Sequence, residues 1–232
     1  MDVNDYLANK EDIIIKSIGN PIDKLTLTGK APENLSELFY FYNADEGINC
    51  KVIDVSNLDT SNATVMDFMF ADCESLKEIK GLDTLNTSKV INMNGMFNNC
   101  RNLKTLDISN FDTSNVIDMC DMFYNCENLE TLDLSNFDTS KVIDMEWMFC
   151  SCENLETLDL SNFNTSKVIN MQYMFNSCKN LKTLNISNFN MKNVRFTSGI
   201  FDYCPYIDAF KLPDDKRFDI YKTNNEDNID LD

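Results

Sequence analysis

The chain has 232 residues, of which 43% are hydrophobic, and its 38 acidic and 20 basic residues give a formal net charge of −18. This composition is typical of a folded protein, and its acidic balance excludes the basic surface that binding to nucleic acids or anionic membranes requires. The apolar runs are too short to cross a bilayer, so we expect no membrane insertion.

Residues 1–49 lack the pattern that fills the rest of the chain, and we interpret them as an N-terminal cap. Their first 20 residues have neither the basic region nor the apolar run of a secretory signal peptide, which predicts a cytoplasmic location. Residues 13–18 are compatible with a helix or a strand. Four apolar residues that follow Pro32 at helical spacing favour a capping helix. They are Leu35, Leu38, Phe39 and Tyr42.

Residues 50–204 contain about six copies of a 26-residue unit, of which residues 126–151, CENLETLDLSNFDTSKVIDMEWMFCS, are the clearest. We number each unit from its cysteine as position 1. Apolar residues recur at positions 4, 7, 9 and 12, the spacing of leucine-rich repeats, and the alternation at positions 7 to 9 predicts a short strand. The cysteines at position 1 are Cys73, Cys100, Cys126, Cys152, Cys178 and Cys204.

The second half of each unit has apolar residues at positions 17, 20, 23 and 24, a spacing that predicts a short helix beginning near position 20. Asn or Asp at position 19 would cap this helix. The sequence therefore predicts an α/β fold, a leucine-rich-repeat-like solenoid with a parallel sheet of one short strand per repeat and short helices on the opposite side. One unit has an extra residue, which we place at Gly81 as a bulge.

Residues 205–232 are interpreted as a C-terminal cap strand followed by an acidic tail. Pro213 would end the strand, and the residues after it are acidic with few apolar side chains, which predicts disorder. The strand is indicated by three residues that imitate positions 4, 7 and 9 of the unit. They are Ile207, Phe210 and Leu212.

The units resemble the BspA-like leucine-rich repeat family of surface-protein type over roughly residues 50–204. The motifs that carry the resemblance are FDTSNVIDMCDMFYNC (111–126), FDTSKVIDMEWMFCSC (137–152) and FNTSKVINMQYMFNSC (163–178). Members are often surface proteins of bacteria or proteins of parasitic protists, and some are implicated in adhesion to host matrix. The resemblance therefore implies an alternative function, an adhesin that binds host extracellular matrix, and an alternative location at the cell surface or outside the cell.

Position 8 of the unit is a candidate binding column because it points outward between two buried residues, on the concave strand face where solenoids dock ligands. Asp107, Asp133 and Asp159 stand in line there, with Thr131 and Ser135 beside them. One interpretation is a solvated face that keeps the sheet soluble. The alternative is a binding strip for a basic protein partner or for calcium.

Position 22 is a second candidate column, because Trp147 and Tyr173 lie off the buried stripe and exposed aromatic rings are favoured in binding hot spots. A tolerated, half-buried rim would give the same pattern. The cysteine column is interpreted as buried thiols, with Cys120 and Cys150 as the more exposed ones.

Histidine is absent, as are a C-x-x-C pair and a glycine-rich phosphate loop, so no enzyme, metal or cofactor is predicted. The leading hypothesis is a non-enzymatic protein–protein interaction module that uses the concave strand face. The adhesin is the alternative, and a hydrolase or other enzyme is less favoured. The sequence leaves the oligomeric state open.

Overall fold

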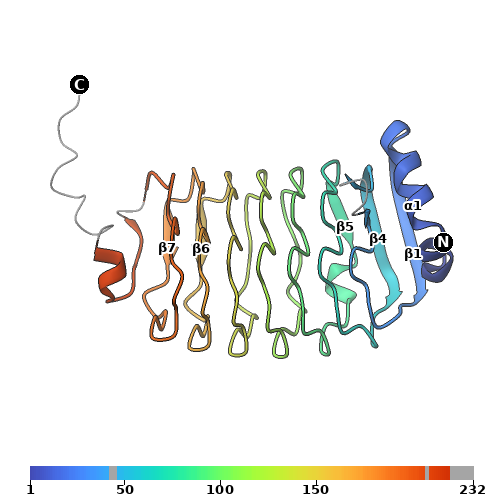
Figure 1. Cartoon of the computed structure of the whole chain (residues 1–232). Coiled ribbons are helices and arrows are strands. Elements are labelled where there is room, and N and C mark those ends of the chain that lie inside the picture. The colour runs from blue at the N-terminus through green and yellow to red at the C-terminus, as the bar shows by residue number, and fades with distance from the viewer. Residues whose placement is uncertain (42–45, 207–208, 220–232) are drawn as a thin grey trace, which may run out of the picture.

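The computed structural model describes residues 1–41, 46–206 and 209–219. The chain is a β-solenoid of about six turns, whose repeats stack side by side from an N-terminal helix and strand to the last repeat at the other end (Figure 1). The predicted stacking of repeats is confirmed. The predicted helices on the opposite side are wrong, since no residue of 46–206 lies in an α-helix.

The helix α1 (Val3–Gly19) covers the N-terminal end of the solenoid. It begins after Asp2, whose carboxylate accepts a hydrogen bond from the backbone N–H of Asn4 at 2.9 Å. Its apolar side is buried, and the ring of Tyr6 lies 5.6 Å from that of Phe39. The ambiguous segment 13–18 is therefore helical. Among the described residues, no helix combines the length and apolar character of a membrane span.

Two groups of parallel strands form the strand face. At the N-terminal end, β4 (Cys50–Asp59) pairs with β1 (Ile22–Lys30) on one side and with β5 (Glu78–Lys80) on the other. Farther along, β6 (Thr157–Asp159) pairs with β7 (Thr183–Asn185).

The remaining described elements are short. The strands β2 (Tyr40–Phe41) and β3 (Glu46–Gly47) form a small antiparallel pair. The extra residue of the irregular unit is accommodated after β5, where Gly81 has a φ of 80° and leads into the 3-10 helix η2 (Leu82–Thr84). A second 3-10 helix, η4 (Lys216–Phe218), lies near the C-terminal end.

The turn side of each repeat takes the place of the predicted helix. At position 19 the repeats are joined by parallel bridges, for example between Asp118 and Asp144. Beyond this bridge, alternate backbone N–H groups donate to carbonyls of the following repeat, as Met119 does to Asp144 at 3.1 Å. A helix would need those donors for its own i to i−4 bonds.

The apolar spacing misled the helix prediction because the turn side is built from i to i−3 bonds, which give a period of three. The N–H of Met122, for example, donates to the carbonyl of Met119 at 3.4 Å. Positions 22 and 26 also adopt the left-handed conformation, with φ of 56° at Asp121 and 60° at Asn125, and this conformation ends a helix. The apolar residues are nevertheless buried as expected.

The predicted capping helix after Pro32 is also wrong, because this segment forms the same kind of turn as the repeats. The N–H groups of Leu35 and Phe39 donate to the carbonyls of Val65 and Met69, each at 2.9 Å. Tyr42, Ile207 and residues 220–232 of the predicted tail lie outside the described residues. The start of that tail, which was expected to be disordered from Asp214, is ordered, since residues 216–218 form a 3-10 helix and Phe218 is buried. The C-terminal segment reaches the strand face at Lys211, which bridges to Asn185.

The core is organised in columns of identical residues. Seven phenylalanine rings stack from repeat to repeat with centroids 5.1–5.8 Å apart and interplanar angles of 18° or less. The column thiols are buried, as predicted, and each donates to a phenylalanine carbonyl of the preceding repeat, as Cys126 does to Phe97 at 3.2 Å. The stacked rings are Phe39, Phe70, Phe97, Phe123, Phe149, Phe175 and Phe201.

Candidate functional site

The strand face changes character where three aspartates follow one another at position 8. Strand pairing joins Asp54 to Lys80 and Asp159 to Asn185. No strand is assigned in the described repeats around Asp107 and Asp133. Like charges directly opposite each other destabilise a sheet, so the aspartates disfavour strand pairing between these repeats.

A groove opens in the strand face between the repeats of Asp133 and Asp159 and has a volume of about 320 Å³. Its floor is partly apolar, because Leu132 is only half-buried whereas the equivalent Leu158 is buried. We call it the strand-face groove. It is lined by Leu132, Asp133, Leu134, Ser135, Thr157, Asp159, Ser161 and Asn162.

Each groove aspartate is held by the serine two residues after it. The backbone N–H of Ser135 donates to Asp133 at 2.9 Å, and that of Ser161 donates to Asp159 at 2.9 Å. These backbone hydrogen bonds, with those of the serine side chains, lower the pKa of both carboxyls from the ordinary aspartate value. Both carboxyls are therefore ionised at neutral pH, with an oxygen each that faces solvent.

The groove carboxylates lack the basic partner that their column-mate near the N-terminus has. Asp54 forms an ion pair with Lys24 at 2.6 Å. Within the described ranges, Asp107, Asp133 and Asp159 form no ion pair, although Lys211 lies near enough to contribute to the lowered pKa of Asp159. The groove thus carries two carboxylates, Asp133 and Asp159, that no ion pair in the described residues neutralises.

The structure separates the aromatic candidates from this groove. Trp147 and Tyr173 lie on the turn side, half-buried, with their rings stacked at a centroid distance of 4.2 Å. Tyr124 contacts Trp147 edge-on at 5.8 Å, and the indole N–H of Trp147 donates to Glu146 at 3.0 Å. Of the residues predicted for binding, Asp133, Ser135 and Asp159 meet in the groove, and the two rings meet elsewhere.

A second acidic group on the turn side escaped the sequence analysis. Ligand atoms of Cys120, Asp144 and Glu146 lie within 4.8 Å of one another. Burial, with neighbouring carboxylates, raises the pKa of Asp144 and raises that of Asp121 to about 6. The signal for this cluster was present in positions 19, 21 and 22, but the expected helix would have pointed these side chains in different directions.

Cys120 is predicted to react slowly despite its partial exposure. Burial, with the carboxylates of Asp121 and Asp144, raises the pKa of its thiol, so little of the reactive thiolate is present at pH 8. Asp121→Asn removes one of these charges, lowers the thiol pKa and should speed iodoacetamide labelling of Cys120 several-fold. Asparagine tolerates the left-handed backbone at this position.

Mass spectrometry of the labelled native protein measures this rate. Asp107→Asn, on the strand face, is the matched control and should leave the rate unchanged. Equal labelling rates in the Asp121→Asn variant and the wild type would show that the carboxylate does not act on the thiol. The companion thiol Cys150 is buried, so the prediction of its exposure was wrong.

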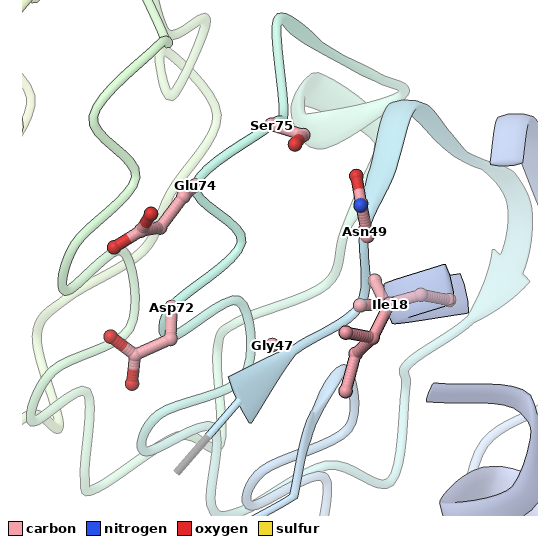
Figure 2. Close-up of a pocket in the computed structure, with 7 residues that line it drawn as sticks. Ile18, Gly47, Asn49, Asp72, Glu74 and Ser75 are labelled. Atoms are coloured by element: carbon pink, nitrogen blue, oxygen red, sulfur yellow. The ribbon is translucent and has the colours of Figure 1, made fainter. Parts of the chain in front are cut away.

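A small pocket of about 110 Å³ lies near the N-terminal end of the solenoid (Figure 2). Ile18 of α1 and Asn49 face Asp72, Glu74 and Ser75 across it. Asp72 accepts a hydrogen bond from the amide of Asn99 at 2.6 Å and is therefore engaged in the packing of the next repeat. The pocket is too small for an extended partner.

A family model described as "Mycoplasma protein of unknown function, DUF285" matches residues 33–132 and again residues 125–227. The chain belongs to the DUF285 family. The first DUF285 match begins one residue before Asn34, whose bridge to Val65 opens the ladder on the turn side. No curated protein and no solved structure matched the chain. The family description names no activity, so functional inference depends on the geometry of the site.

Proposed function

We propose that this DUF285 protein is a non-enzymatic protein-binding module whose strand-face groove takes a basic segment of a protein partner. The observation that carries the proposal is the row of three aspartates that form no ion pair within the described part of the chain, at the point where the strand pairing is interrupted. Keeping three like charges in line costs stability, and a cationic ligand would offset that cost.

The groove offers the two kinds of contact that a lysine or arginine side chain needs. Its aliphatic stem would lie on the half-buried Leu132, and its charged end would reach the carboxylates of Asp133 and Asp159. The hydroxyl of Thr157 is a further acceptor at the groove edge. Since repeats are stacked at strand spacing, about 4.8 Å, an extended segment could place several basic residues along the row.

A kinship with BspA-like leucine-rich repeats is the second part of the proposal, and it is supported by the repeated F-[DN]-T-S motif. It favours a surface adhesin that binds host matrix over a cytoplasmic scaffold. Both use the same groove, and they differ in location and partner. An enzyme finds less support, because the carboxylates recur as a column and form no asymmetric acid–base pair.

The test replaces Asp107, Asp133 and Asp159 by asparagine together and measures binding of a synthetic arginine–glycine peptide by calorimetry. Exposed ion pairs contribute up to about 1 kcal/mol each, so we expect affinity to fall about tenfold. Asparagine keeps the serine hydrogen bonds, as Asn185 already does with Ser187 at 2.9 Å. Any loss of affinity would therefore report charge.

The matched control is the triple variant Asp59→Asn, Asp112→Asn, Asp138→Asn, which removes the same charge from position 13. Asparagine occupies this position in other repeats and accepts the same hydrogen bond, as Asn164 does from Ser166 at 3.1 Å. Its peptide affinity should stay within about twofold of wild type. If both triple variants lost the same affinity for the peptide, the effect would come from the net charge of the protein, and the groove would not be the binding site. Repeating the calorimetry with added EDTA shows whether calcium contributes to peptide binding, because EDTA removes calcium from the solution.

A further inference from the structure

A row of four isoleucines is exposed along the turn side, at position 18 of successive repeats. We call it the isoleucine row. The side chains are 37–45% exposed, whereas the valines that precede them at position 17 are buried in the core. Four partly exposed branched side chains in contiguous register form an apolar stripe. The row consists of Ile91, Ile117, Ile143 and Ile169.

Backbone hydrogen bonds fix the register of the row. The N–H of Ile117 donates to the carbonyl of Ile91, and the same bond joins each later pair, at 2.9 Å in every case. The side chains therefore stand side by side at strand spacing, about 4.8 Å. The ladder continues to Thr64 at one end and Arg195 at the other, so polar residues bound the stripe.

The row is flanked by opposite charges on its two sides. Position 16, two residues before each isoleucine, carries the exposed Lys89, Lys141 and Lys167, and it carries Asn115 in the repeat of Ile117. Positions 19 and 21, on the other side, carry Asp118, Asp144 and Glu146 and are neutral elsewhere in the row, so both signs of charge occur together in the repeat of Ile143. Lys141 helps to lower the pKa of Asp112 and Asp138, which lie at position 13, away from the row. On the other side of the row, burial and the neighbouring carboxylates of Asp118 and Glu146 raise the pKa of Asp144.

This pattern is complementary to itself under one symmetry. If two copies meet through their isoleucine rows about a two-fold axis that runs along the row, Lys141 of each copy faces Asp144 and Glu146 of the other copy. If the axis instead runs across the row, lysines face lysines and carboxylates face carboxylates, which is unfavourable. Charge therefore selects a parallel arrangement, in which each isoleucine opposes the same residue of the partner copy.

We propose that the isoleucine row is a self-association surface, through which two copies of this chain form a parallel dimer. The row is one side chain wide, so the contact belongs with small, transient interfaces, and the dimer forms at high protein concentration. The row lies on the turn side, so dimerisation leaves the strand-face groove open. The inference does not depend on the function proposed for the groove.

Cross-linking through an introduced thiol tests both the contact and its direction. In a Cys120→Ser background, which removes the partly exposed native thiol, Ile143→Cys and Ile91→Cys should each form a disulfide-linked dimer with itself under mild oxidation. The matched control is Thr131→Cys, which is exposed on the strand face. We expect the two row variants to cross-link at least tenfold faster than the control.

Sedimentation velocity over a concentration series gives the second measurement. The wild type should gain mass with concentration, and the variant Ile117→Thr, Ile143→Thr should remain monomeric with an unchanged thermal unfolding midpoint. A wild type that stays monomeric, or row variants that cross-link no faster than Thr131→Cys, would overturn the proposal. Cross-linking of Ile91→Cys only to Ile169→Cys in a mixture would overturn the parallel arrangement.

Discussion

Replacing Phe123 by alanine is expected to lower the free energy of unfolding by about 3–5 kcal/mol, the cost of removing a fully buried aromatic ring. Phe123 is inaccessible to solvent and stacks on Phe97 at 5.8 Å and on Phe149 at 5.6 Å. Its loss leaves a cavity between two repeats that depend on each other for burial, because each repeat contacts its neighbours alone. Urea denaturation followed by circular dichroism measures the change.

Two comparisons make this result interpretable. Phe123→Leu keeps most of the apolar volume and should cost clearly less than Phe123→Ala. Ile117→Ala, in the same repeat but exposed, should change the free energy of unfolding by about 0.5 kcal/mol or less. A cost below about 1 kcal/mol for Phe123→Ala would show that neighbouring rings close the gap and that the ring stack contributes little.

Replacing Thr113 by valine is expected to lower the free energy of unfolding by about 2–4 kcal/mol without creating a cavity. The hydroxyl of Thr113 is buried and joins two repeats, since it donates to the carbonyl of Asp138 at 3.0 Å and accepts from its N–H at 2.8 Å. Valine has nearly the same shape as threonine. The loss of stability would therefore come from the backbone carbonyl and N–H of Asp138, which lose their hydrogen-bond partner.

The control for this change is Thr113→Ser, which keeps the hydroxyl and removes one methyl group. Its expected cost is about 1 kcal/mol. Chemical denaturation of both variants gives the comparison, and the valine variant should have the lower midpoint. If serine proved as damaging as valine, packing of the methyl group would be the main contribution of this column.

The repeat itself could be predicted from the sequence because identical residues recur at a fixed step, and burial follows from that recurrence. Asparagine recurs at position 11, where Asn136 donates to the carbonyls of Ile108 and Phe111 in the preceding repeat. Aspartate or asparagine recurs at position 13, where Asp138 accepts a hydrogen bond from the N–H of Ser140 in the turn. Both follow from local chemistry that needs no knowledge of the fold.

The turn side could not be predicted, because a period of three and a period of 3.6 are alike over seven residues. The two structures differ in which carbonyls accept hydrogen bonds from the backbone N–H groups, and on the turn side many of these carbonyls belong to the neighbouring repeat. The grouping of Cys120 with Asp144 and Glu146 is a consequence of the same geometry. The groove likewise lies where strand pairing is absent. The sequence places three aspartates in line but does not show that the repeats around Asp107 and Asp133 form no strand.

The bonds between the regular repeats join the same pair of positions at each junction, and this has a consequence for how the molecule can vary. Thr113 contacts Asp138 and Thr139 contacts Asn164, each 25 residues on. Insertion or loss of one whole 26-residue segment within the regular repeats would therefore recreate the same junction at the new boundary. The length of such a protein can change in steps of one strand spacing, about 4.8 Å, as genes gain or lose copies. Neither end would have to be rebuilt.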